Sequence, residues 1–374
     1  MPELNIHRRV ALIHDWLTGM RGGEKVLEIL CELFPTADIY TLVHIPGKVS
    51  RTIEYHRIIT SFLQKIPGGS AFYRHLLPLM PQAIERFDFS GYDLLISTSH
   101  CVAKAAKPQD GARHVCYCHT PMRYIWDQYD SYFGPGRASV PVRFGMRTLR
   151  PFLQKWDLAT LSRVHHFIAN SENVRERIRR LYHREASVIY PPADVEFYSQ
   201  GRADRNTDPF YLIVSALAPY KRVEVALEAF RRLGKKLVII GEGQESRVLR
   251  QKAGEHVQFL GWRSNEELRT YYQTARALIF PGEEDFGIVP VEAMAVGCPV
   301  IAFKKGGALE TVVENKTGIF FDSSTAESLA EAVRRFESMR FDTAAIKEHA
   351  RDFSRARCRE AFRSYFVEYQ DEMS

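Results

Sequence analysis

The sequence predicts an α/β protein of two domains, the second of them built on a parallel sheet. Its 374 residues suffice for two domains that each bury a sizeable core. In the second half, short apolar runs alternate with amphipathic stretches at the spacing of βαβ units, which indicates a parallel sheet. Two prolines and a long polar run separate this half from the first. We therefore expect an amino-terminal domain over residues 1–192, a linker over 193–208, a carboxyl-terminal domain over 209–345 and a closing helical segment over 346–374.

The amino-terminal domain begins with an apolar strand at residues 10–14, and a turn leads from it into an amphipathic helix over residues 24–34. Gly22 and Gly23 lie in that turn, where backbone N–H groups can approach an anion without hindrance from a Cβ atom. Further strands are expected at 92–99, 113–117 and 164–169, followed by a capped helix that ends near residue 182.

Two stretches of this half are rich in aromatic and basic residues. Residues 51–89 fit either a helical pair that covers the sheet or a surface for an acceptor or a lipid head group. Residues 137–156 form a basic amphipathic pattern, which Pro141 and Pro151 are expected to break into pieces. Either a solvated helix face or peripheral contact with an anionic membrane would explain that pattern.

The carboxyl-terminal domain alternates strands and helices in chain order. Strands are expected at 211–216, 236–240, 257–260, 277–280 and 300–303, and helices at 223–233, 244–252 and 265–274. After the fourth of these strands, an acidic loop with Glu284 leads to a short helix that Pro290 opens. Val289 is the expected N-cap, which places Glu292 near the third helical position, where backbone N–H groups still point outward. Glu292 then either complements the helix dipole or, because no capping box holds it, offers free oxygens to a ligand with paired hydroxyls.

Composition narrows the classes of function. The positive excess falls in the first half, with 25 Lys and Arg against 19 Asp and Glu in residues 1–200 and 26 of each afterwards. This bias suits an anionic membrane or a phosphorylated lipid, and no motif or aromatic array for nucleic acid is present. No apolar run approaches the ~18–20 residues of a membrane span, and the chain starts with a strand pattern rather than a signal peptide, so a cytoplasmic protein is expected. The six cysteines are scattered in apolar contexts, which indicates reduced thiols, and no metal site is expected because Cys116 and Cys118 lack a second ligand pair.

The run from Glu284 to Glu292 has seven residues between the two glutamates, with Phe-Gly inside and Glu-Ala-Met at its end. It resembles the signature of the retaining glycosyltransferases of family 4, which have the GT-B fold of two Rossmann-like domains facing a cleft. The resemblance implies that Glu284 contacts hydroxyls of the donor sugar and that Glu292 holds the ribose of the sugar nucleotide. It also implies that the backbone amides of Phe286, Gly287 and Ile288 face the sugar and the phosphates.

A second resemblance lies in the run His-Thr-Pro-x-Arg-x-x-Trp-Asp at residues 119–127, which is similar to a subset of the family rich in mannosyltransferases. His119 follows a strand end in a turn stiffened by Pro121, at the edge of a sheet where ligands bind. It is either a structural residue or, by the resemblance, a contact to the donor sugar or phosphate. Gly22 and Gly23 resemble the family's first strand–helix loop, which approaches the donor diphosphate and the acceptor.

Lys221 matches the phosphate-binding lysine of the family, which stabilises the leaving diphosphate. The family usually has an arginine five residues earlier, where this chain has Ala216. Either Arg222 or a residue of the other domain supplies the second charge, or phosphate binding is weaker than usual. In GT-B enzymes the last helix crosses back onto the amino-terminal domain, and residues 346–374 carry an apolar stripe suited to that packing.

Together these resemblances imply a retaining hexosyltransferase in which His119, Glu284 and Lys221 act at the reacting sugar. No metal and no cofactor besides a nucleotide-sugar donor are expected. GDP-mannose is the leading donor, and the expected acceptor is a glycan or a polyprenyl-diphosphate-linked oligosaccharide at the inner face of the membrane. Alternatives within the fold are another sugar nucleotide, a soluble acceptor or a sugar-phosphate synthase. Ala216 keeps open a nucleotide-sugar-binding or epimerase-type protein without transferase activity.

Overall fold

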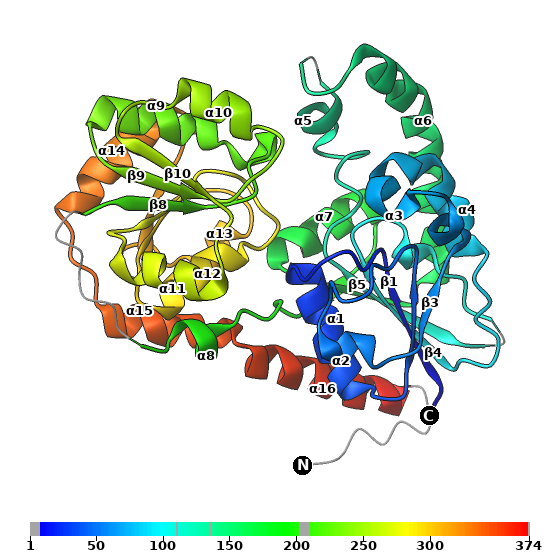
Figure 1. Cartoon of the computed structure of the whole chain (residues 1–374). Coiled ribbons are helices and arrows are strands. Elements are labelled where there is room, and N and C mark those ends of the chain that lie inside the picture. The colour runs from blue at the N-terminus through cyan, green and yellow to red at the C-terminus, as the bar shows by residue number, and fades with distance from the viewer. Residues whose placement is uncertain (1–7, 110, 135, 202–208, 373–374) are drawn as a thin grey trace. The chain divides into compact units, whose positions relative to one another are not determined.

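A computed structural model describes residues 8–109, 111–134, 136–201 and 209–372, and the chain divides into two compact units (Figure 1). The amino-terminal unit comprises Met1–Pro192 together with Cys358–Ser374, and the carboxyl-terminal unit comprises Ala193–Arg357. The expected start of the chain before Arg8, and residues 202–208 of the expected linker, lie outside the described residues.

The amino-terminal unit is built on a seven-stranded parallel sheet in the order β3-β2-β1-β4-β5-β6-β7. Its strands are β1 (Val10–His14), β2 (Asp38–Thr41), β3 (Ile58–Thr60), β4 (Leu94–Ser99), β5 (Arg113–Cys118), β6 (His166–Ala169) and β7 (Ala186–Val188). Side chains alternate across β1, so that Val10 and Leu12 pack in the core on one face while Ala11 and Ile13 pack in the core on the other. The strand predictions at β1, β4, β5 and β6 are confirmed. The pattern missed β2, β3 and β7; β3 and β7 are edge strands whose side chains are partly exposed, so no buried apolar run marks them.

Helices cover both faces of this sheet. They are α1 (Gly22–Leu33), α2 (Arg51–Glu54), α3 (Gly69–Phe72), α4 (Met80–Glu85), α5 (Tyr129–Phe133), α6 (Val140–Ala159), α7 (Glu172–Tyr182) and α16 (Arg355–Glu372), with short 3-10 turns η1 (Phe62–Lys65), η2 (Tyr73–Leu79), η3 (Ala103–Ala105) and η4 (Thr160–Arg163). The last helix, red in Figure 1, belongs to this unit, because Phe362 and Phe366 share a core with Leu27 and Leu30 of α1. Met146 and Leu153 of α6 lie in the core on the opposite face, together with Met80 of α4.

Two predictions about this unit are wrong in detail. The stretch 51–89 forms β3 and a series of short helical turns instead of one helical pair. Residues 140–159 form one helix despite Pro141 and Pro151. Pro141 lies in the first turn, where no intrahelical N–H is needed, and Pro151 lies on the exposed side, where water can reach the carbonyl that lacks its usual donor.

The carboxyl-terminal unit is built on a six-stranded parallel sheet in the order β10-β9-β8-β11-β12-β13. Its strands are β8 (Tyr211–Val214), β9 (Leu237–Ile240), β10 (Val257–Gly261), β11 (Leu278–Phe280), β12 (Val300–Phe303) and β13 (Gly318–Phe321). Its helices are α8 (Val195–Tyr198), η5 (Pro219–Lys221), α9 (Val223–Leu233), α10 (Ser246–Lys252), α11 (Asn265–Thr274), α12 (Ile288–Ala295), α13 (Ala308–Thr311), α14 (Ala326–Glu337), α15 (Thr343–Ala350) and η6 (Arg351–Phe353). The predicted alternation is confirmed. One difference is α8, which lies inside the expected linker and buries Val195 and Tyr198 in this unit.

Strand order locates the candidate site in each unit. In both sheets the first strand, β1 or β8, lies between its second strand and its fourth, β4 or β11. The chain therefore leaves the first and fourth strands in opposite lateral directions, and ligands of open α/β sheets bind outside the carboxyl ends of such a strand pair. None of the described helices combines the length and apolar composition needed to cross a membrane.

Candidate active site

The carboxyl ends of β1 and β4 bring together a cluster of polar residues in the amino-terminal unit. Asp15 follows β1, is fully buried, and accepts four backbone N–H groups from residues 100–103 at 2.7–2.9 Å. Its Oδ2 also lies 3.1 Å from Nδ1 of His100. Asp15 thus fixes the loop after β4 and holds the His100 imidazole at the sheet edge.

His14 and Glu24 form the second part of this cluster. His14 Nδ1 lies 2.6 Å from Thr98 Oγ1 on β4, and its Nε2 lies 3.8 Å from Glu24 Oε1 on α1. Glu24 also accepts the N–H of Arg21 at 3.0 Å, which closes the first turn of α1. Burial alone would raise the pKa of Glu24, but the imidazole of His14, a backbone hydrogen bond and the nearby His100 together outweigh it, and the pKa lies below its usual value.

His119 lies beside the start of α1. A Cβ atom at position 23 would lie 3.3 Å from Cε1 of His14 and 3.4 Å from Nε2 of His119, so both imidazoles lie directly against the first turn of the helix. Gly22 and Gly23 are the first two residues of α1, where backbone N–H groups are not used within the helix. The structure therefore brings together three predicted residues, His119, Gly22 and Gly23.

Burial, followed by the neighbouring His100 and His14, holds the pKa of His119 well below its usual value. The imidazole is therefore neutral near pH 7. Within the described residues, the buried Nε2 atoms of His119 and His14 have no hydrogen-bond partner. A neutral imidazole nitrogen of this kind can exchange a hydrogen bond with a ligand hydroxyl or phosphate oxygen.

Sequence reasoning missed His14, Asp15, Glu24 and His100 as site residues. All four residues lie at the carboxyl ends of β1 and β4 or at the start of α1. Their position could mark them as site residues only if β1 and β4 were known to be neighbouring strands, and the two are about 80 residues apart in sequence.

In the carboxyl-terminal unit, Lys221 and Glu284 form an ion pair at the carboxyl ends of β8 and β11. Their side chains are 13% and 21% exposed, so the pair is largely shielded but open on one side. The loop of Glu284 is held from β12 as well, because its carbonyl accepts the N–H of Gly307 at 2.8 Å and Glu283 pairs with Lys305 at 3.1 Å. A lysine and a carboxylate fixed in this way can bind the phosphate and the hydroxyls of one ligand.

Helix α12 starts earlier than predicted. Its N-cap is Gly287, in the left-handed region at φ +91°, so Val289 is not the N-cap and Glu292 is the fifth helical residue. Pro290 is tolerated at the third position because the first N–H groups of a helix have no intrahelical acceptor. The predicted pair of free oxygens on Glu292 is wrong as well, since Tyr272 donates its hydroxyl to Glu292 Oε2 at 3.3 Å. Both side chains are buried.

The predicted residues Phe286, Gly287 and Ile288 therefore form the turn into α12, and Phe286 packs against Phe353 with ring centroids 5.6 Å apart. Arg222 has a left-handed backbone, and its Nε lies 3.3 Å from Glu224 Oε1. The guanidinium is thus drawn toward α9 and is not part of the Lys221–Glu284 pair. Ala216 follows β8, and its carbonyl accepts the N–H of Ala218 at 2.9 Å.

Comparison with protein families gives two matches in succession. Residues 20–197 match the family described as Glycosyltransferase Family 4, and residues 194–355 match the family described as Glycosyl transferases group 1.

Among curated relatives, an uncharacterized glycosyltransferase of Methanocaldococcus jannaschii is 28% identical over 54% of this chain and 60% of its own length. A GDP-mannose-dependent alpha-(1-6)-phosphatidylinositol monomannoside mannosyltransferase of Mycobacterium tuberculosis is 36% identical over 33% of this chain and 37% of its own length. A D-inositol 3-phosphate glycosyltransferase of Corynebacterium glutamicum is 31% identical over 49% of this chain and 53% of its own length. The chain thus matches less than two thirds of the length of each of these relatives.

Solved structures resemble nearly the whole chain. The lipopolysaccharide outer core galactosyltransferase WaaB matches with a TM-score of 0.69 at 14% identity, covering 96% of this chain and 99% of its own. HepE of Anabaena, in complex with UDP and glucose, matches with a TM-score of 0.70 at 17% identity, covering 96% of this chain and 100% of its own. At such identities the likeness shows the fold alone, and the expected GT-B fold is confirmed.

Proposed function

This chain belongs to the family 4 glycosyltransferases, and from that premise we propose that it transfers a hexose from a nucleotide sugar to a hydroxyl group, with retention at the anomeric carbon. The observation that carries the proposal is the Lys221–Glu284 pair at the carboxyl ends of β8 and β11. The curated relatives at 31% and 36% identity are glycosyltransferases by name, which supports the same class of reaction.

The carboxyl-terminal unit holds the donor in this proposal. When the donor bond breaks, negative charge develops on the departing diphosphate, and stabilising that charge is the main electrostatic task of the site. Lys221 supplies the cation, and the backbone amides of Phe286, Gly287 and Ile288 supply neutral donors at the start of α12. In the absence of ligand, Glu284 neutralises the charge of Lys221. When a diphosphate binds to Lys221, the carboxylate of Glu284 becomes available to accept hydrogen bonds from hydroxyls of the sugar.

Glu292 binds the ribose hydroxyls in this proposal. Its carboxylate is buried, and the hydroxyl of Tyr272 orients one of its oxygens. In the amino-terminal unit, neutral His119 exchanges a hydrogen bond with a sugar hydroxyl or phosphate oxygen, and the first N–H groups of α1 at Gly22 and Gly23 are available to an anion.

The donor we propose is GDP-mannose, and the acceptor is a glycan or a polyprenyl-diphosphate-linked oligosaccharide. Curated relatives from two organisms, Mycobacterium tuberculosis and Mycolicibacterium smegmatis, are GDP-mannose-dependent mannosyltransferases by name, and the His119 run supports the same sugar. We further propose that transfer needs neither a metal ion nor a cofactor, because Lys221 and the backbone amides can neutralise the leaving diphosphate without one.

The test is a thermal-shift series with GDP, UDP, ADP, GDP-mannose and UDP-glucose, each with and without EDTA. A ligand present at ~100 times its dissociation constant adds ~2.7 kcal/mol of stability. Stabilisation by GDP and GDP-mannose alone, unchanged by EDTA, supports the donor and the independence from metal. Stabilisation by UDP-glucose and not by GDP-mannose would indicate that the donor is UDP-glucose. No response to any nucleotide would refute the proposal and favour a role without transfer, with Ala216 as the departure responsible.

A further inference from the structure

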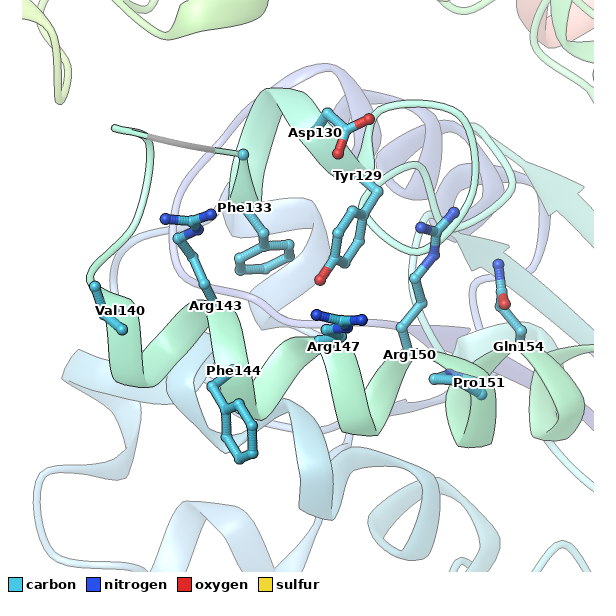
Figure 2. A pocket seen from close by; sticks show the side chains of 11 residues that line it. Tyr129, Asp130, Phe133, Val140, Arg143, Phe144, Arg147, Arg150, Pro151 and Gln154 are labelled. Carbon is cyan, nitrogen blue, oxygen red and sulfur yellow. The ribbon is translucent and has the colours of Figure 1, made fainter.

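A pocket of about 610 Å³ lies between α5 and α6 of the amino-terminal unit (Figure 2). Its aromatic wall comes from α5, and its basic wall comes from one stripe of α6. The lining residues that matter here are Tyr129, Phe133, Val140, Arg143, Arg147 and Arg150. On a helix, residues 143, 147 and 150 share one face, and Figure 2 shows their side chains on the side of α6 that faces α5.

Among the residues that the structure describes, no carboxylate forms an ion pair with any of the three arginines. Asp130 is the one acidic residue of the lining, and it is exposed. The single carboxylate of α6, Asp157, is buried and pairs with Lys104 at 3.0 Å.

Other basic helices of this protein behave differently. On α7, Arg175 pairs with Glu172 at 2.5 Å, and on α9 both Arg231 and Arg232 pair with Glu228 at 2.8 Å. The basic faces of α7 and α9 thus carry their own carboxylates, whereas α10 has basic residues and no carboxylate of its own, and the single carboxylate of α6 pairs with Lys104. What distinguishes the α6 face is that its arginines line a pocket with an aromatic wall, where an anion can be held.

The third arginine of the pocket is already held in place. Arg150 donates from Nε to the carbonyl of Ile125 at 2.8 Å, and its guanidinium carbon lies 4.2 Å from the ring centre of Tyr129. Gln154 donates to the same carbonyl at 2.8 Å. Ile125 belongs to the segment that begins with His119, so these hydrogen bonds connect the pocket residues Arg150 and Gln154 to the candidate active site of this unit.

The surface beside the arginines is apolar. Val140 is 73% exposed, Phe144 71% and Phe152 56%, all on α6. Figure 2 shows Phe144 on the side of the helix turned away from α5. A free inorganic anion would satisfy the arginines and leave these side chains in water, whereas an amphiphile with a phosphate head and an apolar chain would cover both.

We infer that the α5–α6 pocket binds the phosphate group of a lipid, with Arg143 and Arg147 on the phosphate oxygens and the apolar chain along Val140 and Phe144. Two sources share this chemistry. One is an anionic phospholipid of a bilayer, and the other is the diphosphate of a lipid-linked acceptor; only the second rests on the proposed function.

Binding is measured with the full chain in two arms. One is co-sedimentation with vesicles of phosphatidylcholine, with and without phosphatidylglycerol. The other is calorimetric titration with farnesyl diphosphate below its micellar concentration, with farnesol as the uncharged reference. The pocket variant is Arg143→Ala/Arg147→Ala, and the matched control is Arg334→Ala/Arg340→Ala, which removes the same charge from exposed positions of the other unit.

The pocket variant should lose roughly 10- to 30-fold in binding, from the usual contribution of each arginine near an anionic phosphate surface, while the control stays within about twofold. Loss confined to the phosphatidylglycerol arm assigns the pocket to bilayer phospholipid, and loss in the farnesyl diphosphate arm assigns it to the acceptor. Equal losses in the two variants, equal binding to the uncharged references, or no binding by the unaltered protein would overturn the inference. Thermal shift with GDP is run on every variant, because it reports the nucleotide site and folding independently of the pocket.

Discussion

The contact between Tyr272 and Glu292 gives the sharpest prediction about the proposed donor site. Changing Tyr272 to Phe removes one hydroxyl, creates no cavity, and leaves the buried Glu292 carboxylate without the donor that lies 3.3 Å from Oε2. Burial, followed by Glu292, raises the pKa of Tyr272 well above its ordinary value, so this hydroxyl remains a donor at every usable pH. The neighbouring Tyr271 packs against Phe210, and Tyr271→Phe is the matched control.

A hydrogen bond to a charged group contributes about 1.5–3 kcal/mol, and the long distance here favours the lower end. We expect Tyr272→Phe to lower the free energy of unfolding by about 1.5 kcal/mol and the Tm by a few degrees. Because Tyr272 then no longer orients Oε2 of the carboxylate, the Kd for GDP should rise about tenfold. Calorimetric titration with GDP and thermal unfolding measure the two effects on the same preparation, and kcat at saturating donor should stay within about twofold.

If Tyr272→Phe loses stability but binds GDP as the unaltered protein does, Tyr272 is structural only and does not support ligand binding by Glu292. An equal rise in the Kd for GDP in Tyr271→Phe would also contradict a specific role for Tyr272. A fall in kcat with an unchanged Kd for GDP would indicate that Glu292 acts on the reacting sugar and does not bind the ribose.

Three further predictions concern the same two units. Glu284→Ala should abolish glycoside formation with the circular dichroism spectrum unchanged, whereas Glu283→Ala in the same loop should retain activity; an active Glu284→Ala protein would contradict the proposed role. Lys221→Met should lower kcat by about 10²–10³ in a transfer assay, because it removes a preorganised charge from the leaving diphosphate, and Lys305→Met should not. Burial lowers the pKa of His114 from 6.5 to about 3, so its contribution to stability is present above pH 6.5 and is lost as the pH falls, by about 2 kcal/mol at pH 5. In thermal unfolding from pH 7.5 to 5, His114→Gln should reduce the loss of stability by about that amount, with the remaining loss coming from other buried histidines such as His119; an equal loss in both proteins would contradict the assignment.

Local patterns predicted much of this fold. Strands such as β1 and β4 and helices such as α9 and α11 show an apolar period along the chain, and that period reflects which side of an element faces a core. The motif residues Lys221 and Glu284 were placed by sequence in loops at strand ends, and both lie there.

Other features depended on details that a pattern does not contain. The prolines of α6 suggested a broken helix, yet Pro141 falls in the first turn and Pro151 on the exposed side, where each is tolerated. Helix α12 begins at Ile288, earlier than predicted, because Gly287 adopts a left-handed backbone and serves as the N-cap in place of Val289.

By itself the sequence determined two α/β units, the family, and the residue types of the loop from Glu284 to Ile288, because these follow from short-range periodicity and from contiguous motifs. Tertiary structure alone decided which of these residues meet. Asp15 reaches the backbone of residues 100–103, His14 meets Thr98, and Tyr272 meets Glu292, only because strand order and helix packing make neighbours of segments distant in the chain. The uncompensated arginine stripe of α6 likewise became a pocket only once α5 lay against it.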